Sequence, residues 1–132
     1  VNDQTFNANG DYADIDVPIV VLVNGGSASA SELLAGALQD YELATIIGEK
    51  TLGKGTVQTW HELVNGGGVR LTIARWLTPD GHWIHEQGIT PDIPVSWENQ
   101  TFTPGEDDPQ LNAALNYLGT LEVVGEPSGE TQ

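Results

Sequence analysis

The order of apolar and polar residues predicts a buried βαβ unit in the first half of the chain. Residues 18–24 are an unbroken apolar, β-branched run between a proline and a Gly-Gly pair, which is typical of a buried strand, and residues 43–48 form a second such run. Residues 29–40 carry apolar side chains at helical spacing. The side chains expected on the inner face of that helix are Leu33, Leu34, Ala37 and Leu38. Residues 18–48 therefore predict a βαβ unit, which is right-handed by default.

The spacing of apolar residues changes to two after residue 55. Residues 57–63 and 69–74 alternate on either side of a glycine-rich turn and predict a pair of antiparallel strands with one solvated face. Residues 89–95 are extended, but Pro91 and Pro94 confine them to a sheet edge or to non-sheet structure. The expected fold class is therefore α/β, with antiparallel strands after the buried unit and a helix near the C-terminus.

Four segments follow from this pattern. We expect a polar, acidic lead-in over 1–16, a core over 17–98, a linker and helix over 99–119, and a frayed tail over 120–132. The helix itself is expected at 108–118 because apolar residues recur there at helical spacing. The side chains expected on its inner side are Leu111, Ala114, Leu115 and Leu118.

Composition excludes several classes of partner. The chain has 132 residues with 19 acidic and 4 basic side chains, for a net charge of −15, so it repels nucleic-acid phosphates and anionic lipids. No apolar run approaches the ~20 residues of a membrane-spanning helix, so no membrane insertion of this chain is expected. Cysteine is absent, which excludes a disulfide framework and a thiolate zinc site. The histidines, His61, His82 and His85, are scattered, and neither a metal nor a cofactor is expected.

The turn after the first buried strand is a candidate for catalysis. Asn24-Gly-Gly-Ser-Ala-Ser-Ala-Ser-Glu32 puts small residues and hydroxyl groups where a parallel strand leads into a helix N-terminus. Ligands bind at this end of the strands in open α/β sheets, and a helix N-terminus favours developing negative charge. A serine here could expose its hydroxyl while the next amide binds an oxyanion. Ser29-Ala-Ser-Glu32 also fits a capping box, which would only begin a helix, so both interpretations stay open.

A second candidate follows the second buried strand. Gly48-Glu-Lys-Thr-Leu-Gly-Lys-Gly55 nearly matches a phosphate-binding loop. However, Gly55 stands where a magnesium-binding hydroxyl belongs, and a strand follows instead of a helix, so a nucleotide site is disfavoured. What remains is Lys54, held between two glycines that allow close backbone approach and partial burial, with Gln58 four residues further on.

Ser29 and Lys54 can meet above the sheet because they follow neighbouring strands. A lysine acts as a base when desolvation or nearby positive potential lowers its pKa towards the working pH. Lys54 could then take the proton of Ser29 as the hydroxyl attacks a carbonyl, with Gln58 holding the amine by a hydrogen bond. This arrangement would permit Ser/Lys hydrolysis.

Several joined motifs resemble the C-terminal processing peptidases, also called tail-specific proteases. Residues 18–40 are similar to that family's nucleophile segment, and residues 47–58 to its lysine segment. Residues 71–81 (LTIARWLTPDG) and 88–92 (GITPD) are similar to the strand pair and the short motif that follow. The resemblance runs in order from about residue 17 to 95. It implies a protease core of the crotonase-like ββα superfamily, of which this chain would hold only the C-terminal part.

The resemblance also implies roles for individual residues. Ser29 matches the family's nucleophile, Lys54 its general base, and Gln58 the residue that orients the lysine. The backbone amide of Ala30 would be one oxyanion donor. Asp40 matches an aspartate that has been linked to activity in the family, although its place at the end of a helix favours a structural role.

Other side chains are interpreted as structural. Ser27 and Ser31 are assigned to turn and helix-cap hydroxyls. The tryptophans are interpreted as packing residues in preference to the lining of a peptide groove; they are Trp60, Trp76, Trp83 and Trp97.

Two parts of the family's machinery have no counterpart in this sequence. They are the PDZ-type domain that captures substrate tails and the upstream segment that supplies the second oxyanion donor. Methionine is absent as well, and we expect the chain to be part of a longer protein. Loss of one oxyanion donor lowers the rate about 10²–10³-fold, so the isolated chain is expected to fold yet be nearly inactive. Its uncovered sheet edge is expected to promote dimerisation or strand exchange.

The sequence therefore predicts a serine endopeptidase with a Ser/Lys dyad that cleaves polypeptides near their C-terminus without a metal or cofactor. The resemblance implies substrates bound through their C-terminal tails and a location outside the cytoplasm, in periplasm, cell envelope or thylakoid lumen. The alternative is a non-enzymatic binding module of the same fold that carries a peptide or hydrophobic ligand. The presence of Ser29, Lys54 and Gln58 together favours the enzyme, because a carrier needs none of them.

Overall fold

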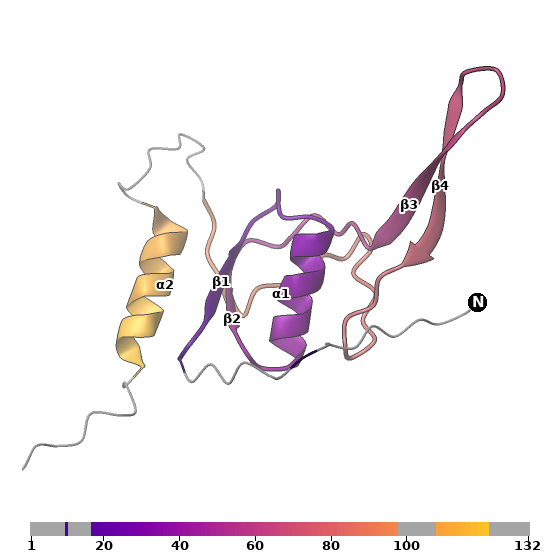
Figure 1. Ribbon diagram of the computed structural model, residues 1–132. Coiled ribbons are helices and arrows are strands. Elements are labelled where there is room, and N and C mark those ends of the chain that lie inside the picture. The colour runs from indigo at the N-terminus through magenta and orange to yellow at the C-terminus, as the bar shows by residue number, and fades with distance from the viewer. Residues whose placement is uncertain (1–9, 11–16, 98–107, 122–132) are drawn as a thin grey trace, which may run out of the picture.

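The computed structural model describes residues 10, 17–97 and 108–121. Its elements, shown in Figure 1, are β1 (Val20–Val23), α1 (Ala30–Asp40), β2 (Thr45–Gly48), β3 (Thr56–Glu62), β4 (Gly68–Arg75), β5 (Ile93–Pro94) and α2 (Pro109–Thr120). The predicted lead-in, apart from Gly10, and most of the predicted linker and tail lie outside the described residues. The proposed segment boundaries therefore stay predictions.

The predicted βαβ unit is present. β1 and β2 pair in parallel, with Val23 opposite Gly48 at their carboxyl ends, and α1 connects them. Val23, Ile46 and Ala35 form a buried cluster between the strands and the helix. Both strands are rich in β-branched residues, which suits strands covered by other elements. Because the strands are parallel neighbours, the turns that follow them lie at the same edge of the sheet.

β5 extends this sheet on the far side of β2, in the order β1-β2-β5. The edge placement predicted from Pro91 and Pro94 is therefore confirmed, because an edge strand needs no ladder bond on its outer side. Asp92 fixes the start of β5. Its carboxylate accepts hydrogen bonds from the Ile46 backbone N–H at 2.8 Å and the Gln39 side-chain amide at 2.7 Å.

β3 and β4 form a separate antiparallel hairpin that extends away from the parallel sheet (Figure 1). The pairing is regular towards the turn, and an irregularity lies between Val57 and Gln58. The predicted pair of strands is confirmed. The prediction of a single solvated face is wrong for the described part of the chain, since every residue of β4 after Gly68 is exposed. No described element packs as a layer over either face of the hairpin.

α1 buries a different face from the one predicted. It buries Glu32 and Gly36, whereas Leu34 is 62% exposed and the other predicted inner residues are half-buried. Gly36 lets the helix approach its neighbours so closely that an added Cβ would lie 2.9 Å from side-chain carbons of both Ile89 and Thr78. The contact is therefore made through a small residue and a buried carboxylate, which apolar spacing cannot indicate.

α2 also departs from the predicted inner side. Asp108 caps the helix by accepting hydrogen bonds from the backbone N–H groups two and three residues further on. The buried residues are Gln110 and Ala114, whereas Leu111 and Leu115 are exposed. Gln110 is turned inward because its side-chain amide donates to a backbone carbonyl just after β5. The helix lies against β1 and β2, and this polar contact sets its rotation.

Candidate active site

The turn after β1 places Ser29 at the N-cap of α1 with φ 60° and ψ −115°. A positive φ is uncommon for a residue that has a side chain, and strained turns of this kind expose serine nucleophiles between a strand and a helix. Ala30 is the first residue of α1, and N–H groups in the first turn have no acceptor within their own helix. A hydroxyl and a free amide thus lie together at a helix end that favours negative charge.

The neighbouring serines have local roles in the turn. Ser27 Oγ accepts a hydrogen bond from the backbone N–H of Asn24 at 3.1 Å. The Ser31 hydroxyl donates to the carbonyl of Ala28 at 2.7 Å. Both act as turn or cap hydroxyls, as predicted, which leaves Ser29 as the candidate nucleophile of this segment.

Glu32 is a fully buried carboxylate, with an exposed fraction of 0%. Its Oε2 atom accepts hydrogen bonds from the backbone N–H groups of Ser29 and Lys54, each at 2.8 Å. Its Oε1 atom accepts from the Thr51 hydroxyl and the Gly53 N–H, each at 2.5 Å. One oxygen atom therefore lies between the backbone nitrogens of the two candidate catalytic residues. The carboxylate ties the loop after β2 to the start of α1.

These hydrogen bonds determine the charge state of Glu32. Burial raises the pKa of the carboxyl, but hydrogen bonds from Thr51, Lys54, Gly53 and Ser29 outweigh it, so the pKa falls below its ordinary value of 4.5. Glu32 is therefore ionised at neutral pH, and four donors satisfy its buried charge.

The sequence places Glu32 in a capping box and indicates no further partner for it. Its bond to the Ser29 N–H is the glutamate half of that box. The other three bonds reach Thr51, Gly53 and Lys54, about twenty residues further along the chain. The one available signal was a charged residue beside the predicted inner face of α1, and that signal gives no indication of its partners.

The loop that carries Lys54 is also held by the segment before β5. The Gly53 carbonyl accepts from the backbone N–H of Glu86 at 2.8 Å, and the Gly55 carbonyl accepts from the Trp83 indole N–H at 3.2 Å. An added Cβ would lie 2.9 Å from a backbone nitrogen of this segment at Gly53, and 2.5 Å at Gly55. The close backbone approach predicted for the two glycines is confirmed.

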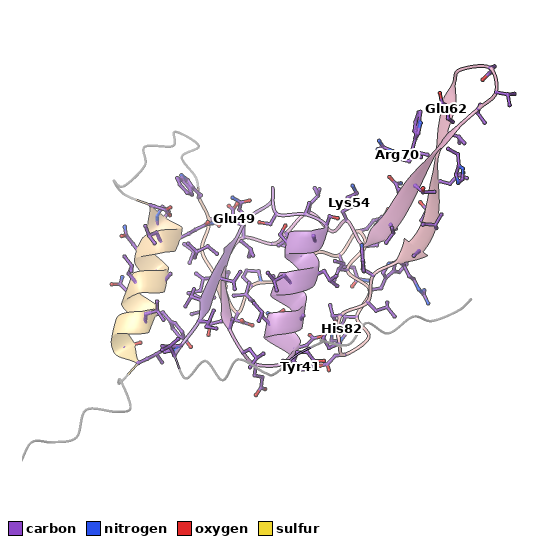
Figure 2. All side chains as sticks on the ribbon, viewed as in Figure 1. Tyr41, Glu49, Lys54, Glu62, Arg70 and His82 are labelled. Carbon is purple, nitrogen blue, oxygen red and sulfur yellow. The ribbon has the colours of Figure 1, made fainter. Side chains whose placement is uncertain are left out.

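Hydrogen bonds to Glu32 hold the backbones of Ser29 and Lys54, but their side chains are not held against each other. Lys54 is exposed, so the predicted partial burial is wrong; Figure 2 shows it beside the N-terminal end of α1. Within the described residues, no hydrogen bond joins Lys54 Nζ to Ser29 Oγ or to Gln58. The Gln58 amide instead donates to the Thr72 hydroxyl at 3.5 Å across the hairpin. The fold brings together the backbones of Ser29 and Lys54 but does not form the dyad contact.

Asp40 is the last residue of α1, at the end opposite Ser29, where Figure 2 shows His82. Its carboxylate accepts from the backbone N–H of Asp80 at 2.9 Å and lies 3.8 Å from His82 Nδ1. A cavity of about 430 Å³ beside this pair contains neither Ser29 nor Lys54. These contacts support the structural interpretation of Asp40.

Among the described residues, no group of three or more His, Cys, Asp or Glu side chains is placed to hold a metal ion. Neither described helix is long and apolar enough to cross a membrane.

Comparison with known proteins places this chain among the peptidases. The sequence model of peptidase family S41 matches residues 1–95. The chain therefore belongs to peptidase family S41, and the resemblance seen in the sequence is confirmed.

Curated relatives carry matching descriptions. A carboxyl-terminal-processing protease of Synechocystis sp. is 50% identical over 117 residues, which cover 87% of this chain and 27% of that protein. A probable CtpA-like serine protease of Staphylococcus epidermidis is 46% identical over 122 residues, which cover 85% of this chain and 24% of that protein. The chain thus spans only about a quarter of the length of these relatives.

Solved structures agree on the fold. The photosystem II D1 C-terminal processing protease is 49% identical, with a TM-score of 0.62 over 67% of this chain and 23% of that one. The tricorn protease has a TM-score of 0.61 over 76% of this chain and 10% of that one, and at 22% identity it shows a shared fold alone. The mixed α/β fold, with a parallel and an antiparallel sheet, is therefore confirmed.

Proposed function

We propose that Ser29 and Lys54 form the catalytic dyad of a serine endopeptidase that cleaves polypeptides near their C-terminus. The observation that carries this proposal is the shared acceptor Glu32 Oε2, because one carboxylate oxygen fixes the backbone of both residues. Membership of peptidase family S41 and relatives named as carboxyl-terminal-processing proteases support the reaction and the class of substrate.

The reaction follows from the chemistry of these groups. Unprotonated Lys54 Nζ takes the proton of Ser29 as Oγ attacks the carbon of the scissile carbonyl. The N–H of Ala30 binds the resulting oxyanion at the helix N-terminus. The Lys54 ammonium then protonates the leaving amine, which leaves an acyl-serine. Lys54 next deprotonates a water molecule, which hydrolyses the ester and restores the Ser29 hydroxyl.

Two side-chain movements lead from the observed arrangement to the reactive one. Lys54 turns towards Ser29, and Gln58 exchanges its bond to Thr72 for one to Lys54 Nζ. The Gln58–Thr72 bond is 3.5 Å long, well beyond the usual length, so it is weak and easily replaced. Catalytic hydrogen bonds are often long or unformed without substrate and tighten when substrate binds.

The same proposal includes the superfamily of the core, the capture of substrate tails, the location and the self-association that the sequence predicts. The βαβ unit with its third parallel strand supports a crotonase-like ββα core. Capture of substrate C-terminal tails and a location outside the cytoplasm rest on the family resemblance. Dimerisation or strand exchange of the isolated chain is supported by exposed apolar side chains on the hairpin, among them Leu71 and Ile73.

The decisive experiment treats the intact protein with a serine-directed acylating reagent and measures single-turnover cleavage of a peptide. We expect Ser29→Ala to lose both labelling and cleavage. The matched control Ser31→Ala removes a hydroxyl two residues away and should keep both, with a loss of about 1 kcal/mol in stability from the missing hydrogen bond to Ala28. Cleavage that survives in Ser29→Ala would refute the proposal. Failure of the folded wild type to label or cleave would favour the peptide-binding module instead.

A further inference from the structure

We propose that one face of the β3–β4 hairpin binds an extended stretch of the polypeptide substrate and selects an acidic side chain there. We call it the recognition face; it consists of Gln58, Trp60, Arg70 and Thr72. The inference rests on the proposed peptidase function and gives that function a source of specificity.

The recognition face is continuous with the candidate catalytic residues. Side chains alternate between the two faces of a strand, so Gln58 and Trp60 lie on the same side of β3. Thr72 and Arg70 stand opposite them on β4. Gln58 is the residue proposed to orient Lys54, so the face begins at the reaction centre. Figure 2 shows Lys54 near the base of the hairpin and Arg70 further out along it.

Trp60 provides an aromatic surface on this face. The residue is 61% exposed, yet its ring lies over the backbone of Gly68, where an added Cβ would fall 1.8 Å from the ring carbon Cζ2. The glycine therefore makes room for the indole ring against the hairpin backbone. A ring supported in this way offers a large apolar contact to a peptide and loses little side-chain entropy on binding. The packing role predicted for this tryptophan accounts for only one side of its ring.

Arg70 supplies a positive charge with no carboxylate partner among the described residues. All four Lys and Arg residues lie between positions 50 and 75, in a chain whose net charge is −15. Among the described residues, the one basic side chain within salt-bridge distance of a carboxylate is His82, which lies 3.8 Å from Asp40. The other hairpin arginine, Arg75, lies over the Trp83 ring at 5.7 Å. The Arg70 guanidinium is therefore available to bind a substrate carboxylate through two hydrogen bonds.

Glu62 restricts where that carboxylate can lie. It stands opposite Gly68 on the same face, closer to the hairpin turn than Arg70. Its negative charge repels a substrate carboxylate at the outer end, so the favoured place is between Arg70 and the reaction centre. Gln58 and Trp60 are roughly 7 Å apart along the strand, the length of two residues of extended peptide. We therefore place the acidic residue about two to four residues from the scissile bond.

The test uses the intact protein and peptides in which a single Asp, Asn or Lys is moved through the positions on each side of the scissile bond. At one position, Asp should lower KM about two- to fivefold relative to Asn, with kcat unchanged, as expected for an exposed ion pair. Salt at about 0.5 M should remove the difference. Arg70→Gln should abolish the preference, and Arg70→Glu should transfer it to Lys at the same position. Such an inversion is not expected from a purely structural change.

Matched variants separate this inference from the proposed function. Arg75→Gln removes the other hairpin arginine and should keep the wild-type preference for Asp. Trp60→Ala should raise KM for all the peptides, and Trp60→Phe should restore part of the loss. If the wild type cleaves the whole series without preferring Asp at any position, this inference alone is overturned. The same holds if Arg70→Gln keeps the preference for Asp. A folded wild type that cleaves none of the peptides overturns the proposed function and the inference with it.

Discussion

Replacing Glu32 with glutamine keeps the length of the side chain but removes its charge and one of its two acceptor oxygens. In the native site each oxygen accepts two hydrogen bonds. If the amide nitrogen replaced Oε2, it would face the backbone N–H groups of Ser29 and Lys54, which can only donate hydrogen bonds. In the Oε1 place it would face the Gly53 N–H and the Thr51 hydroxyl, and only the hydroxyl can turn to accept. The glutamine oxygen should therefore remain between Ser29 and Lys54.

This orientation sets the size of the effect. A hydrogen bond to a charged group contributes about 1.5–3 kcal/mol, and one between neutral groups about 1 kcal/mol. Glu32→Gln weakens two bonds, reverses one and leaves the Gly53 N–H without its acceptor. We expect a loss of about 2–4 kcal/mol in stability, which a domain with the usual 5–15 kcal/mol survives. A displacement of Lys54 by a fraction of an ångström should lower kcat about ten- to a hundredfold.

The assay combines thermal unfolding of the intact protein with single-turnover cleavage of a neutral peptide. The control is Glu62→Gln, which removes the same charge from an exposed position and should change stability by less than about 0.5 kcal/mol. If Glu32→Gln matches this control in both stability and kcat, then the carboxylate does not hold the two segments together, and the reasoning is refuted.

The remaining predictions concern pH, the base and the packing of α1. Folding lowers the pKa of Glu32, so the contribution of its charge to stability is complete above about pH 5. This contribution is lost as the pH falls through the folded-state pKa, which lies below 4.5. Unfolding measured against pH should therefore show that the stability difference between wild type and Glu32→Gln shrinks over that range. Lys54→Arg keeps the charge but cannot lose its proton near neutral pH, so it should abolish cleavage about as fully as Lys54→Ala; robust activity in Lys54→Arg would contradict the proposed base. Gly36→Ala places a Cβ 2.9 Å from side-chain carbons of Ile89 and Thr78 and should destabilise by about 1–3 kcal/mol in thermal or denaturant unfolding; an unchanged midpoint would show that these side chains move aside freely.

The local pattern of apolar and polar residues predicts those elements whose structure depends on residues close to them in the sequence. The buried runs at β1 and β2 and the alternation of β3 and β4 follow directly from side-chain periodicity. The faces of the helices did not follow. α1 turns Glu32 inward because its partners lie after β2, and it packs through Gly36 because Ile89 approaches from after the hairpin. Such long-range contacts leave no periodic signal.

In the candidate site, too, some features could be predicted from the sequence and others depend on long-range contacts. Ser29 and Lys54 could be placed near each other because turns after neighbouring parallel strands share an edge of the sheet. The exposure of Lys54 and the bond from Gln58 to Thr72 depend on how the hairpin leaves the sheet, and no motif encodes that. The central place of Glu32 is visible only once the loop after β2 is folded against α1.

The ends of the hairpin meet at a single atom, because the Gly55 carbonyl accepts from the backbone N–H of Trp76 at 2.9 Å as well as from the Trp83 indole. The twenty residues between Gly55 and Trp76 therefore form a long loop whose two ends are held together at a fixed base. The entropic cost of closing such a loop grows only slowly with its length. Hairpins that keep Gln58 but differ in length or composition beyond it can thus be exchanged in evolution or by engineering without shifting Lys54. Selectivity for substrates can change in this way while the chemistry stays the same.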